Sequence, residues 1–117
     1  MPKFMRSLSW IFLLICVPLA QARPAPLNIV GFDDMSCQAW TRSKGDAEQR
    51  SQYIAWIRGV LTGHNYARRT EQVSVISGAT VEQFVDRFCR ETPAGNFSDA
   101  AFRMSDRFSG RNSAILR

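Results

Sequence analysis

Three residues of the sequence stand out as chemically versatile: the only histidine, His64, and the cysteines Cys37 and Cys89. A serine hydrolase would use His64 as general base beside a serine and an acid, partners that linear spacing does not reveal. Nothing close to His64 in the sequence supports such a triad. At helical spacing His64 follows Trp56 and Val60, which favours a packed or interfacial histidine. A pH-sensing role stays open, because histidine titrates near neutrality.

The N-terminus has the pattern of a secretory signal peptide. Lys3 and Arg6 provide positive charge, residues 8–19 form a short apolar run, and Ala20-Gln21-Ala22 is a small-x-small cleavage pattern. We therefore expect residues 1–22 to be removed on export to the periplasm. This segment is then the chain's one contact with a membrane.

Two other interpretations of the N-terminus stay open. A retained anchor would have to cross the bilayer with about 12 apolar residues, where about 20 are needed. A lipoprotein would be lipidated at Cys16, but Ile15 occupies the position where a small residue is expected.

Cleavage changes the composition of the working chain. Removing 22 of the 117 residues leaves 95, and the loss of Lys3 and Arg6 lowers the formal charge from +5 to +3. The remaining basic residues are dispersed, whereas nucleic-acid binders cluster theirs on one face. We therefore expect no nucleic-acid partner.

Two cysteines in a small exported domain are most simply one disulfide, Cys37–Cys89, with two free thiols as the alternative. Closing a loop of this size stabilises the fold by about 4 kcal/mol in the chain-entropy model. One histidine and two paired cysteines leave no zinc-ligand set, and the sequence has neither a phosphate loop nor a dinucleotide fingerprint. We expect no metal site, no cofactor, no catalytic residues and no enzymatic activity.

The hydrophobic patterning predicts an all-α, four-helix orthogonal bundle behind an extended leader. The leader covers residues 23–34, with a short extended segment at 27–32. The helical domain covers residues 35–110 and a flexible tail residues 111–117. The predicted helices are residues 35–42, 47–69, a third from Thr80 to Thr92, and 99–109, with a loop at 70–79.

Helix boundaries are predicted from capping residues. Asp33 or Asp34 caps the first helix, which Ser43-Lys44-Gly45 ends, and Asp46 caps the second with Gln49 at capping-box spacing. Thr80, with Gln83, caps the third helix. Ser98 caps the fourth, where Phe97 and Phe102 are placed as a hydrophobic staple and Gly110 as the C-terminal glycine. The pairing of Cys37 with Cys89 would then join the first helix to the third.

Gly59 and Gly63 lie inside the longest predicted helix, where each costs about 1 kcal/mol relative to alanine. Close approach of another helix, or a bend, would offset this cost. Trp40, Trp56, Phe84 and Phe88 are expected on buried faces, while Phe102 and Phe108 either cover the core or form an exposed patch. The candidate partner-binding residues are Gly59, Gly63, His64, Phe102 and Phe108.

Three stretches carry a family resemblance: Met35–Trp40 (MSCQAW), Tyr53–Gly59 (YIAWIRG) and Phe88–Pro93 (FCRETP). A Cys-x-x-aromatic element, a Trp-x-x-Gly helix and a final cysteine followed by proline resemble the HdeA/HdeB-like superfamily, including the related Rap/Tai-type immunity proteins. This resemblance implies a bacterial periplasmic four-helix protein with one disulfide and no enzymatic activity.

The function expected from these observations is a chaperone-like, protein-binding module of the HdeA/HdeB type. Its partners would be unfolded client proteins, and a homodimer is compatible with the same surfaces. The alternative is an immunity or secretion-accessory protein that binds one specific partner, such as a toxin. A small hydrolase using His64 is the third hypothesis.

Overall fold

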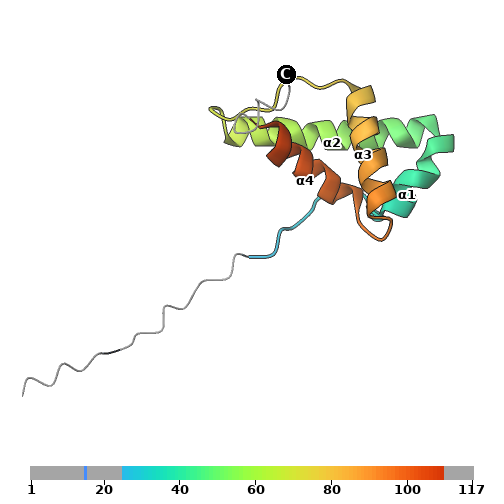
Figure 1. Ribbon diagram of the computed structural model, residues 1–117, viewed down its shortest axis with the longest axis horizontal. Helices are drawn as coiled ribbons and strands as arrows, with labels where there is room; N and C mark the ends of the chain where they lie inside the picture. Colours follow the sequence, from blue (N-terminus) through green and yellow to red (C-terminus); the bar gives the residue numbers. More distant parts are fainter. Residues whose placement is uncertain (1–14, 16–24, 110–117) are drawn as a thin grey trace, which may run out of the picture.

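The computed structural model describes residue 15 and residues 25–109, and this part of the chain is all-α with one disulfide, as predicted (Figure 1). The proposed signal peptide, apart from Ile15, and the tail at 111–117 with Gly110 lie outside the described residues. The elements are α1 (Cys37–Arg42), the 3₁₀ turn η1 (Ser43–Gly45), α2 (Ala47–Ala67), α3 (Gly78–Glu91) and α4 (Phe97–Phe108).

The first helix is shorter than predicted and has a different cap. Ser36, rather than Asp33 or Asp34, is the N-cap, and its hydroxyl accepts a hydrogen bond from Ala39 N at 3.1 Å. Asp34 instead accepts from Ser36 N at 3.0 Å, so it supports the capping residue from outside the helix. Residues 43–45 were predicted as a plain break, but they continue the helix as one tight 3₁₀ turn.

The predicted cap of α2 is confirmed, because Asp46 accepts a hydrogen bond from Gln49 N at 3.1 Å. The helix ends at Ala67, two residues before the predicted end. The loop predicted at 70–79 lies at residues 68–77, which contain neither helix nor strand. One side-chain amide holds this loop: Asn65 accepts from Val73 N at 2.7 Å and donates to Val73 O at 2.9 Å.

The predicted caps of α3 and α4 were wrong. Ser77 caps α3 by accepting from Thr80 N at 3.1 Å, so the helix begins at Gly78 and Thr80 lies within its first turn. For α4 the N-cap is Asn96. Ser98 is buried, and Phe97 is the first residue of the helix with no exposed surface, so it belongs to the core instead of forming a staple with Phe102.

The core lies where α2, α3 and α4 meet. Figure 1 shows α3 lying across α2, with α4 running obliquely beneath it. Three buried rings pack together at the centre: the ring centroids of Tyr53 and Phe97 are 4.6 Å apart, and those of Trp40 and Phe97 are 5.8 Å apart. Trp40 and Phe88 are buried as predicted, whereas Trp56 and Phe84 are only partly buried and pack against the core.

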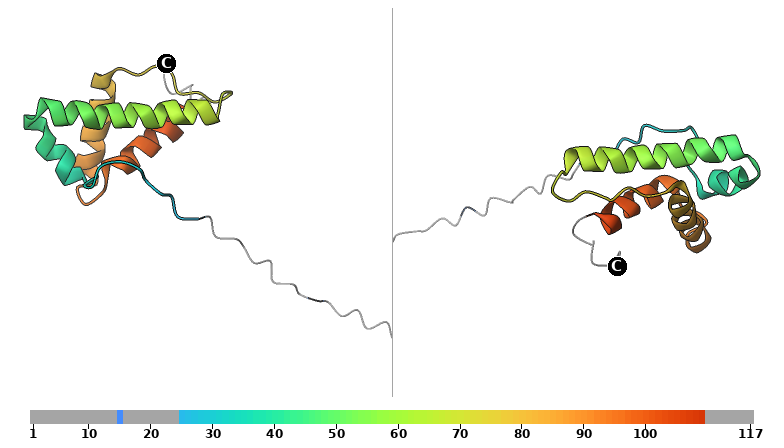
Figure 2. Two further views of the ribbon diagram at one scale, coloured as in Figure 1. Left: turned by 180° about the vertical axis from the view of Figure 1, so that it is seen from behind. Right: turned by 90° about the horizontal axis from the view of Figure 1, so that it is seen from above.

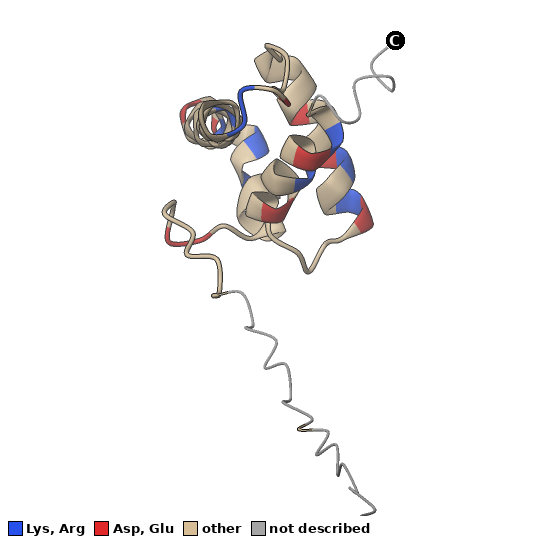
Figure 3. Ribbon diagram, turned by 90° about the vertical axis from the view of Figure 1, so that its left-hand side faces the viewer, with Lys and Arg blue, Asp and Glu red and all other residues tan. Residues whose placement is uncertain are grey.

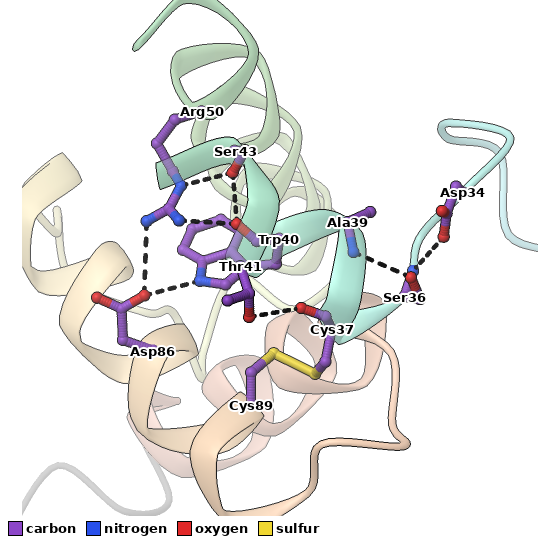
Figure 4. The surroundings of a disulfide bond; sticks show 10 residues. All are labelled: Asp34, Ser36, Cys37, Ala39, Trp40, Thr41, Ser43, Arg50, Asp86 and Cys89. Atoms are coloured by element: carbon purple, nitrogen blue, oxygen red, sulfur yellow. Dashed lines mark hydrogen bonds and ion pairs between the residues drawn. A yellow bond between two sulfur atoms is a disulfide. The ribbon is translucent and has the colours of Figure 1, made fainter. Parts of the chain in front are cut away.

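A disulfide and a buried arginine fasten α1 to the rest of the bundle (Figure 4). Cys37 and Cys89 join α1 to α3 across 52 residues of sequence, which confirms the predicted disulfide. Arg50 is 6% exposed and lies over the Trp40 ring, 4.0 Å from its centroid. The guanidinium donates to Ser43 Oγ and to the Trp40 carbonyl oxygen, each at 2.7 Å.

Two carboxylates of α3 balance the charge of Arg50. Its NH1 is 2.7 Å from Glu82 Oε1 and 3.5 Å from Asp86 Oδ1. Asp86 Oδ1 also accepts a hydrogen bond from Trp40 Nε1 at 2.8 Å. Each polar group that Arg50 and Trp40 bring into the interior therefore has a partner, as burial requires.

Candidate binding groove

The side chain of His64 bridges three parts of the fold. Its Nε2 lies 2.8 Å from the Glu71 carbonyl oxygen, and its Nδ1 lies 2.6 Å from Ser105 Oγ. A carbonyl oxygen can only accept, so Nε2 carries the proton and, in the neutral ring, Nδ1 accepts from the Ser105 hydroxyl. Ser105, 41 residues away in sequence, is thus a hydroxyl partner that no local pattern around His64 indicated.

The His64–Ser105 pair has part of the geometry of a hydrolase, but its position favours a structural role. Ser105 is 9% exposed and lies inside α4. The backbone N–H groups there form hydrogen bonds within the helix, so they do not provide an oxyanion hole. The pair connects α2, α4 and the loop after α2. We interpret it as an interhelical clamp.

The two glycines of α2 do not provide a close contact with another helix. A Cβ atom built at Gly59 or at Gly63 meets no other atom within 4 Å, and both residues are exposed. The close approach predicted for this face was wrong. Without side chains, this part of α2 is a shallow, open surface.

The two candidate phenylalanines of α4 lie in different environments. Phe108 packs edge-to-face on Phe84, with ring centroids 5.6 Å apart, and so helps cover the core between α3 and α4. Phe102 is half-buried and lines a groove together with Gly59. The five candidate residues therefore do not form one site. Gly59 and Phe102 line the same groove, Gly63 is not part of its lining, and His64 and Phe108 have structural partners of their own.

The groove is formed where the leader passes α2 and α4. It has a volume of about 390 Å³ and is lined by Leu27, Asn28, Ile29, Val30, Trp56, Gly59, Val60 and Phe102. Trp56 Nε1 donates a 2.8 Å hydrogen bond to the Val30 carbonyl oxygen, and Phe32 stacks edge-on against Tyr53 with centroids 4.8 Å apart. These contacts fix the leader against the bundle, and Figure 2 shows it continuing into α1.

The leader leaves large apolar side chains in solvent beside this groove. Leu27 is 69% exposed, Ile29 44% and Val30 89%. None of the described residues that line the groove is charged. Figure 3 shows the same contrast, because acidic and basic residues are interspersed on the helices, whereas residues 25–32 of the leader, none of them charged, are tan. Clustered apolar exposure of this kind marks interaction sites.

No family model, curated protein or solved structure matches this chain. Within residues 25–109, no cluster of three or more histidine, cysteine or acidic side chains is placed to hold a metal ion. None of the described helices combines the length and apolar character needed to cross a bilayer.

A second concavity, of about 400 Å³, lies over the disulfide between α1 and the end of α3. Its walls are Cys37, Gln38, Thr41, Arg42, Cys89 and Pro93. Both cysteines are buried, and no large exposed apolar residue borders this concavity. The groove beside the leader is therefore the better candidate for binding another molecule.

Sequence reasoning missed the leader as part of the site and Arg50 as part of the core. Arg50 lies three and seven residues before Tyr53 and Ile57, which places it on the buried stripe of α2. That register was the available signal, but arginine is seldom buried unless paired, and its partners are 32 and 36 residues away.

Proposed function

We propose that this chain is an exported, non-enzymatic protein-binding module of the chaperone-like type, and that its leader groove receives apolar segments of client proteins. The observation that carries the proposal is the position of Leu27, Ile29 and Val30, which stay exposed beside a groove floored by Trp56 and Phe102. The uncharged lining supports binding through burial of apolar surface. Such binding does not require one particular sequence, so many client proteins could use it. The periplasm is the proposed location, and the disulfide is compatible with export.

Acid is the proposed trigger for stronger binding. Full protonation of all ten Asp and Glu side chains and of the histidine would raise the formal charge of the cleaved chain from +3 to +14. Neutral side chains at Glu82 and Asp86 would leave the buried Arg50 guanidinium without its two countercharges. Lys44 and Arg90 line a small pocket together with Arg50, and the positive charges of these three side chains repel one another. Such repulsion favours loosening of the contact between α2 and α3.

The proposal is tested by protection of two unrelated aggregating clients at pH 7 and pH 3. We expect the Leu27→Ser/Val30→Ser variant to protect at least several-fold less well than the wild type. Val75→Ser is the matched control, because Val75 is 97% exposed but lies in the loop after α2, away from the leader groove. Equal protection by all three proteins would contradict binding in this groove.

The acid trigger has a separate test at constant pH. Glu82→Gln/Asp86→Asn removes both countercharges of Arg50 and retains oxygen acceptors at both positions. This variant should bind an apolar dye at pH 7 more strongly than the wild type does. Dye binding equal to the wild type at pH 7 would show that this ion-pair network is not the trigger.

The alternative function is an immunity-type module that binds one partner at neutral pH. The disulfide and the satisfied Arg50 network favour it, because a rigid scaffold reduces the entropy lost on binding. This function requires a stoichiometric complex with a single toxin at pH 7 and no protection of unrelated clients. Client protection by the wild type at both pH values would refute it.

A further inference from the structure

The backbone of the leader offers unused hydrogen-bonding groups along the groove. Among the described residues, the N–H and C=O groups of Leu27, Asn28 and Ile29 pair with no other backbone group. For Val30, the hydrogen bond found within the described part of the chain is the one that its carbonyl oxygen accepts from Trp56 Nε1. Residues 25–30 contain no helix or turn, so this stretch resembles the edge of a sheet without its neighbour.

The two ends of this edge are defined by the sequence. Pro26 has no N–H group, so pairing cannot extend through it toward the N-terminus. At the other end the chain bends at Gly31, where a Cβ atom would lie 3.0 Å from Met35 Sδ and 3.2 Å from Trp56 Nε1. The stretch beside which a partner strand can lie is therefore Leu27 to Val30.

Successive residues of an extended chain direct their backbone groups to opposite edges. The carbonyl of Val30 is directed to Trp56 on α2. By alternation, the backbone groups of Leu27 and Ile29 are directed to the opposite, outer edge. Both the N–H and the C=O of these two residues are then available to an incoming strand.

We propose that Leu27–Val30 receives a short, uncharged, extended segment of the client protein by strand addition at its outer edge, so that apolar side chains of that segment extend the groove wall formed by Leu27 and Ile29. This inference rests on the proposed function and specifies how its client is recognised. Main-chain pairing provides affinity without demanding one sequence, and the groove selects apolar side chains at alternate positions.

The size and charge of the site favour such a segment over a second copy of this chain. Eight residues line the groove, whereas a stable dimer uses about 20–30 residues from each partner. The volume of about 390 Å³ lies within the range of sites that enclose small ligands, about 300–1,000 Å³. The absence of charge in the lining matches a segment without charged side chains.

The test uses a fluorescein-labelled, capped hexapeptide of alternating valine and threonine, with binding to the purified protein followed by anisotropy. Ile29→Pro removes an outer-edge N–H group and the isoleucine side chain, whereas Ile29→Ala removes only most of the side chain. We expect Ile29→Pro to bind the peptide about 3- to 10-fold more weakly than Ile29→Ala, the effect of one hydrogen bond. Circular dichroism checks that both variants are folded.

The peptide provides a second, independent measurement. N-methylation at alternate residues blocks one of its edges, and N-methylation at the other residues blocks the opposite edge. We expect one methylated peptide to lose at least 10-fold in affinity, while the other retains binding within about 3-fold. Equal affinities for the two methylated peptides, together with equal binding by Ile29→Pro and Ile29→Ala, would overturn strand addition.

The failure of this inference is distinguishable from failure of the proposed function. If Phe102→Ser weakens peptide binding but the proline and N-methyl changes do not, the groove binds clients without main-chain pairing. If the peptide does not bind and clients are not protected, both proposals are wrong. A dimer seen by sedimentation and lost in Ile29→Pro would assign the edge to a second copy and overturn the inference.

Discussion

Replacing Asp86 by alanine tests whether this carboxylate acts as a hydrogen-bond acceptor or as a countercharge. Asp86 Oδ1 accepts from Trp40 Nε1 at 2.8 Å and lies 3.5 Å from Arg50 NH1. Asp86→Ala removes both interactions. Asp86→Asn retains an oxygen acceptor for the indole and removes only the charge.

The expected magnitudes follow from burial. Trp40 is 1% exposed, and leaving its N–H group without an acceptor costs about 1–3 kcal/mol. The Asp86 side chain is 37% exposed, so its ion pair with Arg50 is worth only about 0–1 kcal/mol after solvent screening. Arg50 also keeps Glu82 at 2.7 Å. We expect Asp86→Ala to lower the free energy of unfolding by about 2–3 kcal/mol and Asp86→Asn by about 1 kcal/mol or less.

Urea unfolding at pH 7, followed by far-UV circular dichroism with the disulfide intact, measures both changes. Gln83→Ala is the control, because Gln83 is an exposed residue of the same helix and the change should stay within about 0.5 kcal/mol. Equal destabilisation by Asp86→Ala and Asp86→Asn would refute the argument, since the charge would then dominate over the indole hydrogen bond.

Three further predictions concern other parts of the described chain. Cys37→Ser/Cys89→Ser should lower the free energy of unfolding by about 4 kcal/mol, measured against the oxidised protein, because the disulfide closes a loop across 52 residues; a loss under about 1 kcal/mol would contradict this. Gly63→Ala should raise the free energy of unfolding by about 1 kcal/mol, because the new Cβ meets nothing within 4 Å and alanine favours helix; destabilisation in urea would refute it. Hydrogen bonds from the side chain and backbone of Ser36, with a further contribution from Arg42, hold the pKa of Asp34 below its ordinary value. Ionised Asp34 therefore stabilises the fold above the ordinary carboxyl pKa, and this contribution is lost as the pH falls through the lowered pKa. The stability difference between wild type and Asp34→Asn should shrink over that acidic range and not between pH 6 and 8.

The sequence predicted those features that depend on neighbouring residues. The cap at Asp46 was correct because the backbone N–H that its side chain accepts from, that of Gln49, lies only three residues away in the same turn. The cap at Thr80 was wrong because Ser77 offers the same spacing three residues earlier, and Gly78 was interpreted as part of the loop. Two overlapping capping patterns compete there, and only packing of the first turn decides between them.

The parts of the candidate site that the sequence did not reveal depend on distant contacts. Ser105 reaches His64 across 41 residues, and Trp56 meets the Val30 carbonyl across 26. Trp56 was expected in the core because it belongs to the apolar stripe of its helix. Helical spacing alone does not show which residues of such a stripe lie at the edge of the core. The leader has no helical or strand periodicity in its apolar residues, so the sequence did not predict where it packs. Its contribution to the groove is visible only in the structure.

The two tryptophans of the described chain differ in a way that provides two optical probes. Trp40 is 1% exposed, with its indole N–H bound to a carboxylate in the interior, whereas Trp56 lies at the groove and its indole N–H is bound to the leader. Indole emission depends on the polarity around the ring, so occupation of the groove should alter the emission of Trp56 first. Trp40→Phe and Trp56→Phe variants would therefore separate the signal of binding from the signal of unfolding within one unlabelled molecule.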